Sequence, residues 1–376
     1  MTAIETAERF IDESIASGVV ADGPDTRDDA QFGAVALEVF EYQYERIPLY
    51  RRLCELRSVD PACVRHWHEI PAAPADLFKE DLGVAEDAGS VVFASSGTTA
   101  GPGRRSHRAL GPRSYDLYRR SSLAMFRAMV LPDNPGVMSV LVLGPTAATH
   151  PQSSLGHMYS FVADAVAARD GDRCSVACML GADGNLDLDA TVSSLEQAAA
   201  ATRPVLLLAL RSTMTAVFET LRARGLALRL PADSRLVETG GSKGARTLSR
   251  GGLLHAAWRF LHIPTYLCTG EYGMTELVSQ FYDDALRSRW SGRLGPRAKT
   301  GPRWTRTVVV DPVTLEPLPR GERGLLRHVD LASCDAVTAV QTLDVGVETA
   351  TGFEVLGRAE GSETRGCSQL MSVLSD

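Results

Sequence analysis

Two glycine-containing loops combine the residue types that nucleotide binding requires. The first, "SSGTTAGPGRRSH", covers residues 95–107 and follows the apolar run 91–93. Its hydroxyls and unhindered backbone N–H groups could converge on phosphate oxygens. Because no lysine follows its second glycine, it is not a Walker A motif, and a plain glycine turn between a strand and a helix is the alternative. The candidate nucleotide-binding residues here are Ser95, Ser96, Gly97, Thr98 and Thr99.

The second loop, "GEYGMTE", covers residues 270–276 and also follows a strand-like run. The ring of Tyr272 could stack on a purine, and the hydroxyl of Thr275 could hold a phosphate. The carboxylate of Glu276 could hold Mg²⁺ against that phosphate, because Mg²⁺ prefers oxygen ligands. We therefore expect this loop, with Gly273 and Met274 between those side chains, to take part in nucleotide binding.

Composition indicates a globular chain long enough for one large domain or two ordinary ones. The 376 residues are 44% hydrophobic and 23% charged, which is ordinary globular usage. A net charge of -7, with arginines scattered among acids, argues against a nucleic-acid partner. The absence of a long apolar run or a signal peptide predicts a cytoplasmic protein without membrane insertion. Seven cysteines, an odd number in such a chain, are expected to be free thiols.

The apolar runs that precede the loops predict an α/β fold. Unalternated Val- and Leu-rich runs, spaced by helical patterns, are typical of strands buried on both faces of a parallel sheet. Such runs occur within "SVVFASSGTT", "GVMSVLVLGPT", "PVLLLAL", "SRLVETGGSKG" and "PTYLCTGEYGMTE". In such sheets the ligand lies beyond the carboxyl ends of the strands, where these loops fall. We expect a helical lead-in over 1–85, an α/β core over 86–300, a β-rich subdomain over 301–356 and a short tail over 357–376.

Taken together, the two loops resemble the signatures of the adenylate-forming superfamily, which contains acyl-CoA synthetases, adenylation domains and luciferases. Three further matches follow in the same order: "GERGLL" at 321–326, "QTLDVG" with Asp344, and "GRAEGSETRG" with Arg358. The resemblance implies a mixed and parallel sheet covered by helices, with ATP and Mg²⁺ bound at the loops. It also implies that Asp344 holds the ribose hydroxyls and that Arg358 lies at the family's Gly-Arg hinge.

Closer still, the chain resembles the acyl-protein synthetases, the LuxE-like proteins of bacterial luminescence systems, over nearly its whole length. The phrases that carry this are "ASSGTTA", "PQSSLGHM", "VETGGSKG", "YGMTELVSQFYD" and "GRAEGSETRGCS". The resemblance implies that a carboxylic acid, fatty or aryl, is activated as an acyl-adenylate and then passed to a cysteine near the C-terminus, here Cys367. Coenzyme A, a carrier-protein thiol or an amine are the other possible acceptors, and the possible partners are an acyl carrier protein, coenzyme A or a partner enzyme. A bacterial biosynthetic pathway would suit the chain as well as luminescence.

The chain departs from the superfamily in its lysines. Typical members carry a further domain with a catalytic lysine, whereas the last lysine here is Lys299, so we expect that C-terminal domain to be absent. Lys243 lies in a glycine loop after a strand-like run, with Gly240 and Gly241 before it. Lys243 is the candidate for neutralising charge that develops on the α-phosphate, and a solvated loop lysine is the alternative.

The residues after the strand-like "VLVLGPT" are candidates for binding the acid. Adenylating enzymes line their acyl pocket at the corresponding place, which implies substrate-binding roles for His150, Ser153, Ser154 and Gly156. His150 could contact the carboxylate, and a hydrogen-bonded structural histidine is the alternative.

Two rival functions use the same sequence. "GGSKG" also fits the G-x-S-x-G nucleophile elbow, so Ser242 could be the nucleophile of an acyltransferase or hydrolase, with Asp311 and His328 suitable only by their order. A non-catalytic adenylate-fold partner of another enzyme is the second rival. Cys174 and Cys178 have no neighbouring metal ligands in the sequence, and we expect them to be buried thiols of a core element.

Overall fold

The computed structural model describes two compact units of the chain. The described residues are 2–20, 26–80, 90–95, 105–171, 174–240, 247–293 and 295–359. The first unit comprises Met1–Met125, Gly273–Phe281 and Ala298–Asp376, and the second comprises Phe126–Tyr272 and Tyr282–Arg297.

The second unit is built on a parallel sheet with the strand order β8-β7-β6-β4-β5. Its strands are β4 (Ser139–Leu143), β5 (Val176–Cys178), β6 (Val205–Leu210), β7 (Arg235–Thr239) and β8 (Cys268–Tyr272). Its helices are α5 (Ser154–Asp170), α6 (Leu188–Ala200), α7 (Arg211–Ala223), α8 (Arg250–Leu261), α9 (Ala285–Trp290) and the 3-10 turn η5 (Thr265–Leu267). Each unalternated run from residue 136 onward forms a buried parallel strand, which confirms the predicted α/β class.

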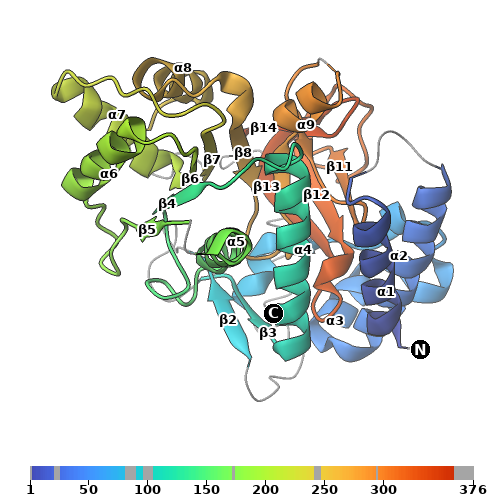
Figure 1. Cartoon of the computed structure of the whole chain (residues 1–376). Coiled ribbons are helices and arrows are strands. Elements are labelled where there is room, and N and C mark those ends of the chain that lie inside the picture. The colour runs from blue at the N-terminus through green and yellow to red at the C-terminus, as the bar shows by residue number, and fades with distance from the viewer. Residues whose placement is uncertain are drawn as a thin grey trace. The chain divides into compact units, whose positions relative to one another are not determined.

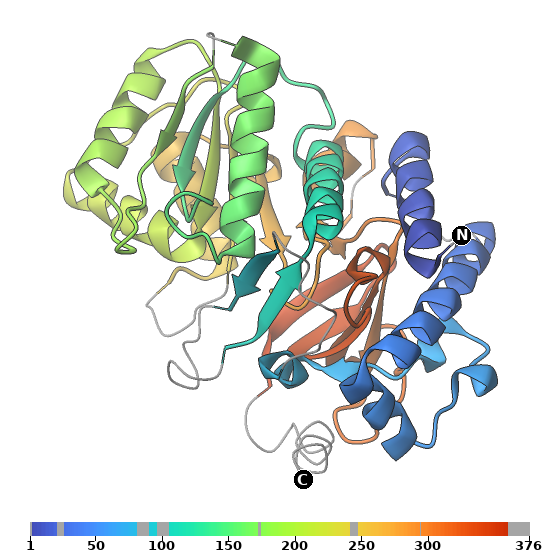
Figure 2. The same ribbon diagram turned by 90° about the horizontal axis from the view of Figure 1, so that it is seen from below.

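Helices cover both faces of this sheet. Helices α6, α7 and α8 pack on one face through an apolar core that includes Leu195, Phe218 and Leu261, all fully buried. Figure 2 shows α5 on the opposite face, and the hydroxyl of the fully buried Tyr159 on α5 donates a hydrogen bond to the carbonyl of Ala209 in β6, at 3.0 Å. Burial on both faces explains why these strands lack an apolar-polar alternation.

The first unit contains a mostly antiparallel sheet with helices beside it. In strand order β11-β12-β13-β14-β10, consecutive neighbours pair antiparallel, and β1 pairs parallel with the first half of β13. The strands are β1 (Ala73–Pro74), β10 (Lys299–Thr300), β11 (Thr305–Val310), β12 (Arg323–Asp330), β13 (Ala339–Glu348) and β14 (Phe353–Arg358). Strands β10 to β14 all begin within the stretch 301–356 that was predicted to be β-rich or directly beside it.

The helices of the first unit come mainly from its N-terminal part, and Figure 1 shows them in blue beside the orange and red strands. They are α1 (Ala3–Ser17), α2 (Thr26–Arg46) and α3 (Pro48–Leu56), with the 3-10 turns η1 (Pro61–Cys63), η2 (Trp67–Glu69), η3 (Ala75–Lys79) and η6 (Leu331–Ser333). Thr2 and Glu5 form a capping box that starts α1. Helix α4 (Pro112–Val130) leads from the first unit into the second, and strand β9 (Phe281–Asp283) crosses the same boundary.

The prediction that the apolar run 91–93 forms a strand of the parallel sheet is wrong. Strand β2 (Val91–Ala94) instead pairs antiparallel with β3 (His107–Leu110) in a separate two-stranded sheet, and Val92 is exposed. A parallel pair needs a crossover connection, usually through a helix. The stretch 95–106 between these strands is rich in glycine and arginine in sequence, and the chain returns antiparallel after it.

The prediction of free thiols is confirmed for the described cysteines, whereas the prediction that Cys174 and Cys178 are buried in a core element is wrong. All six cysteines within the described ranges are free. Cys174 is half-buried and Cys178 is exposed, however, because β5 is the last strand of its sheet and turns Val176 and Cys178 outward. In the part of the chain that the structure describes, no helix has both the length and the apolar character needed to cross a membrane.

Candidate functional site

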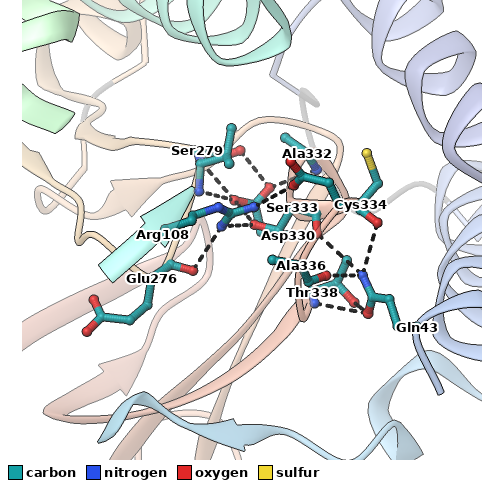
Figure 3. A network of polar contacts seen from close by, with 12 residues as sticks. Gln43, Arg108, Glu276, Ser279, Asp330, Ala332, Ser333, Cys334, Ala336 and Thr338 are labelled. Carbon is teal, nitrogen blue, oxygen red and sulfur yellow. Dashed lines mark hydrogen bonds and ion pairs between the residues drawn. The ribbon is translucent and has the colours of Figure 1, made fainter. Parts of the chain in front are cut away.

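The loop that carries Thr275 and Glu276 is held from two sides within the first unit. Both residues are buried, at 9% and 7% exposure. On one side, Arg108 of β3 donates a hydrogen bond from Nη1 to the carbonyl oxygen of Glu276, at 3.3 Å. On the other side, Asp330 at the end of β12 accepts hydrogen bonds from the backbone N–H groups of Val278 and Ser279, at 2.9 and 2.8 Å (Figure 3). Two buried charged side chains therefore hold the main chain from residue 276 to residue 279.

Arg108 binds more than this loop. Its guanidinium also donates to the hydroxyl of Ser333 at 3.0 Å and forms an ion pair with Asp335 at 3.1 Å. Arg108 is only 3% exposed, so these interactions replace the water that an arginine would otherwise keep. Ser333 in turn donates a hydrogen bond to Asp330 at 3.4 Å, so the two charged residues belong to one network.

Gln43 of α2 supports the chain between β12 and β13. Its side-chain amide donates to the carbonyl oxygens of Ser333, Cys334 and Ala336. Its carbonyl oxygen accepts from the N–H and the hydroxyl of Thr338, at 3.2 and 3.1 Å. Figure 3 shows this amide inserted beside the turn, which is thereby fixed to the helical layer of the same unit.

The carboxylate of Glu276 points away from this network in Figure 3, although its carbonyl oxygen points into it. The structure thus separates two tasks in one residue, with the main chain anchored and the carboxylate directed elsewhere. Among the described residues, no group of three or more His, Cys, Asp or Glu side chains could hold a metal ion. One carboxylate with a neighbouring hydroxyl still fits Mg²⁺, because Mg²⁺ usually takes one or two carboxylates together with substrate phosphates and water.

Asp344 and Arg358, which the sequence places in separate motifs, are direct neighbours in the sheet. They are Cα partners across the antiparallel pair of β13 and β14. Asp344 is half-buried, and its N–H donates to the hydroxyl of Thr342 at 3.0 Å, whereas Arg358 is exposed. Their predicted roles toward a nucleotide remain predictions, but the structure brings the two residues together.

The candidate acyl-binding residues surround the start of α5 in the second unit. Ser153 is the N-cap of this helix and accepts a hydrogen bond from the N–H of Gly156, at 3.1 Å. A side chain at 156 would meet the carbonyl oxygen of Thr146 at 2.9 Å, which explains the glycine. His150 contacts the hydroxyl of Thr149 through Nδ1 at 2.9 Å. These contacts account for the local fold, and Ser154 begins the helix beside them.

The remaining nucleotide candidates fall partly outside the described residues. Ser95 follows β2, and its N–H donates to the carbonyl of Ser106 at 2.8 Å. Gly240 follows β7 with a φ of +88°, a conformation that favours glycine. Tyr272 ends β8 and is half-buried, and Gly273 and Met274 follow it at the boundary between the units. The predictions for Ser96, Gly97, Thr98, Thr99, Gly241, Ser242, Lys243 and Cys367 lie outside the described residues.

The two later members of the serine-nucleophile alternative each have a local structural role. His328 of β12 is fully buried between the rings of Phe281 and Phe353, and its Nδ1 contacts the hydroxyl of Thr307 at 2.9 Å. Burial lowers the pKa of His328 to about 3, which makes it a poor general base near neutral pH. Asp311 accepts hydrogen bonds from the backbone N–H groups of a turn that follows it. The geometry therefore gives this alternative no support.

The sequence reasoning missed Arg108, Asp330 and Gln43. None lies in a recognisable motif. All three bind main-chain atoms, and because every residue carries the same main-chain atoms, the sequence does not mark the partner. The available signal was a charged residue directly beside apolar ones in a strand, as in "HRAL" and "LLRHVDLA". Such a residue is buried only when it has a partner.

The fold is that of the adenylate-forming enzymes. The structure is similar to that of 2-hydroxyisobutyryl-CoA ligase in the postadenylation state with 2-HIB-AMP, with a TM-score of 0.61 at 15% identity, over 90% of this chain and 69% of that one. For the same ligase in an open conformation with 2-HIB-AMP and CoA, the TM-score is 0.60 at 15% identity, over 88% and 70% of the two chains. For its thioesterification state the TM-score is 0.60 at 16% identity, over 89% and 69%. At such low identity the likeness shows the fold alone.

The sequence narrows this class further. The family described as acyl-protein synthetase, LuxE, matches residues 6–374, and the chain belongs to this family. The resemblance drawn from the motifs is thereby confirmed, and so is the assignment of the chain to the acid ligases. No curated protein is significantly similar to the chain.

Proposed function

We propose that this protein activates a carboxylic acid with ATP and then transfers the acyl group to a thiol. A carboxylate oxygen attacks the α-phosphorus of ATP, the bond to the β-phosphate breaks, and pyrophosphate leaves the acyl-adenylate. The observation that carries the proposal is the anchored loop with Thr275 and Glu276, within a chain of the acyl-protein synthetase family. The solved ligase with the same fold binds an acyl-adenylate, 2-HIB-AMP, together with CoA, which is consistent with this chemistry.

In this proposal the protein mainly positions the reactants and stabilises charge. Glu276 would hold Mg²⁺, and the hydroxyl of Thr275 would donate a hydrogen bond to a phosphate oxygen. The ring of Tyr272 would pack against the adenine. Mg²⁺, when bound, neutralises phosphate charge. Asp344 holds the ribose. Ser95 to Thr99, Gly240, Gly241 and Lys243 are assigned to the phosphates by their sequence alone.

The acyl group then leaves the adenylate for a thiol, with AMP as the leaving group. Cys367 is the acceptor in our proposal, and CoA or a carrier-protein thiol are the other candidates. The acid is bound at the start of α5, where His150, Ser153, Ser154 and Gly156 lie.

The test is ATP–pyrophosphate exchange measured against a panel of fatty and aryl acids. At least one acid should support exchange in the wild-type protein. Glu276→Gln should then lower the exchange rate by about 100-fold or more, as expected for the loss of a charged group that stabilises the transition state. Glu354→Gln, at an exposed glutamate of β14, is the control and should leave the rate unchanged. The proposal would be refuted if no acid of the panel supported exchange, or if Glu276→Gln exchanged at the full wild-type rate.

The acceptor needs a separate experiment. Cys367→Ser should retain exchange and lose covalent labelling of the protein by a radioactive form of the acid that supports exchange. If labelling persists in Cys367→Ser, Cys367 is not the acceptor, and the adenylation step stands.

A further inference from the structure

We propose that Arg108 is the positioning residue that sets the geometry of the Glu276 loop for adenylation. This inference rests on the proposed function and goes beyond the motif residues, because Arg108 belongs to none of them. It concerns a side chain that acts through the main chain of Glu276.

The first reason is the position of Arg108 in the chain. β3 begins at His107, directly after the glycine-rich stretch 95–106 that the motif assigns to phosphate binding. Arg108 is the second residue of this strand and donates to the carbonyl oxygen of Glu276. One side chain therefore connects the strand that follows one motif with the main chain of the other.

The second reason is the fixed geometry of a guanidinium. A planar fork with several N–H donors can hold acceptors in set directions, which a lysine ammonium cannot do. Arg108 uses this fork for three acceptors: the carbonyl of Glu276, the hydroxyl of Ser333 and the carboxylate of Asp335. The last two belong to the turn after β12, so the Glu276 carbonyl is fixed relative to the antiparallel sheet.

The third reason is that the neighbouring part of the loop has its own anchor. Asp330 binds the N–H groups of Val278 and Ser279, and the indole of Trp304 donates to the hydroxyl of Ser279 at 2.9 Å. These contacts lie two or three residues beyond Glu276. Loss of Arg108 would therefore remove the hydrogen bond at the carbonyl of Glu276 while Asp330 keeps its own bonds to Val278 and Ser279.

The test compares Arg108→Lys with a matched control, Arg235→Lys. Arg235 of β7 is also fully buried, also pairs with an aspartate, Asp133, and also donates to a backbone carbonyl, that of Val130. Arg235 belongs to the second unit and has no role in the proposed site. Both variants are expected to melt at a lower temperature than the wild type, so melting temperature alone does not distinguish them.

Two readouts distinguish positioning from a merely structural role. In exchange assays, kcat of Arg108→Lys should fall by roughly 100-fold per folded molecule, because small displacements of a catalytic group cost about that much, while KM for the acid stays within about twofold. In native-state hydrogen exchange, peptides covering 273–281 should lose protection about fivefold, as expected for the loss of one hydrogen bond. Arg235→Lys should change neither readout.

The outcomes separate this inference from the proposed function. Unchanged protection of 273–281 in folded Arg108→Lys overturns the inference, and so does a fall in kcat that Arg235→Lys reproduces. If no acid of the panel supports ATP–pyrophosphate exchange in the wild type, the proposed function fails. The comparison by native-state hydrogen exchange then still decides whether Arg108 positions the loop.

Discussion

Replacing Asp330 with asparagine should destabilise the first unit far more than the same substitution at Asp311. Asp330 is fully buried and accepts five hydrogen bonds, from the backbone N–H groups of Val278, Ser279 and Ala332 and from the hydroxyls of Ser279 and Ser333. Asp311 lies in a turn and accepts from two backbone N–H groups and one hydroxyl through a single oxygen, Oδ1.

The magnitude follows from what an asparagine amide can accept. Its NH₂ group cannot accept, so at least one N–H that Asp330 satisfies becomes a buried donor without a partner. The least costly orientation places the NH₂ at the Oδ1 position. There the hydroxyl of Ser279 can rotate and accept a hydrogen bond from the NH₂, whereas the N–H of Ala332 can only donate and loses its acceptor. An unsatisfied buried donor costs about 1–3 kcal/mol, and the remaining bonds weaken because the acceptor loses its charge. We expect a loss of about 3 kcal/mol for Asp330→Asn, against less than about 1 kcal/mol for Asp311→Asn, whose oxygen can keep all its donors.

Urea unfolding followed by tryptophan fluorescence measures the difference. Trp304 is fully buried and donates to the hydroxyl of Ser279, so its emission reports on the unfolding of this network. The midpoint of Asp330→Asn should fall well below that of Asp311→Asn at similar denaturant dependence. If the two variants unfold at the same urea concentration, the hydrogen bonds to the Asp330 carboxylate do not stabilise the unit more than those to Asp311.

Two further predictions concern titratable groups. Burial lowers the pKa of His328 to about 3 from 6.5, so between these pH values the unfolded chain binds a proton that the native chain does not. The contribution of His328 to the free energy of unfolding should therefore be constant above pH 7 and should fall as the pH drops from 6.5 to 3, by up to about 1.4 kcal/mol per pH unit. His328→Gln removes this contribution, and urea midpoints from pH 8 to pH 5 should show its difference from the wild type shrinking as the pH falls; a constant difference would contradict the assignment. In native protein at pH 8, iodoacetamide should modify the exposed Cys63 and Cys178 well before Cys54 and Cys268, whose thiol pKa values burial raises to about 12. Mass spectrometry of the alkylated peptides checks this order, and equal modification of all four would contradict the described burial.

Much of the fold was predictable because burial on two faces leaves a direct mark on sequence. The runs that form β4 and β6 are apolar almost throughout and do not alternate, and a strand with helices on both sides needs that composition. The run 91–93 carries the same mark and yet forms a partly exposed strand of a two-stranded sheet. A short apolar run specifies a strand, whereas its partner depends on the connection that follows, which composition does not specify.

The candidate site was predictable only for groups with chemistry of their own. A carboxylate after a hydroxyl and an aromatic, as in the loop of Glu276, is an unusual combination that suggests a ligand. The pairing of Asp344 with Arg358 could not be read from either motif, because it depends on the register of β13 and β14. That register includes a shift between Val345 and Gly346, which no local pattern in the sequence indicates.

The anchors of the loop show why motif reading stops short of mechanism. In the proposed function Thr275 and Glu276 supply the atoms that bind the nucleotide, but their side chains start from a main chain that enters the first unit only at Gly273. Within that unit the main chain is held at the carbonyl of residue 276 by a cation and at the next amides by an anion, so each end of the peptide dipoles meets the opposite charge. A neutral anchor could satisfy the same groups but would hold them less firmly. The two buried charges at this place fit the positioning role proposed for Arg108, because buried charges are costly when any partner is lost and stability alone explains them poorly.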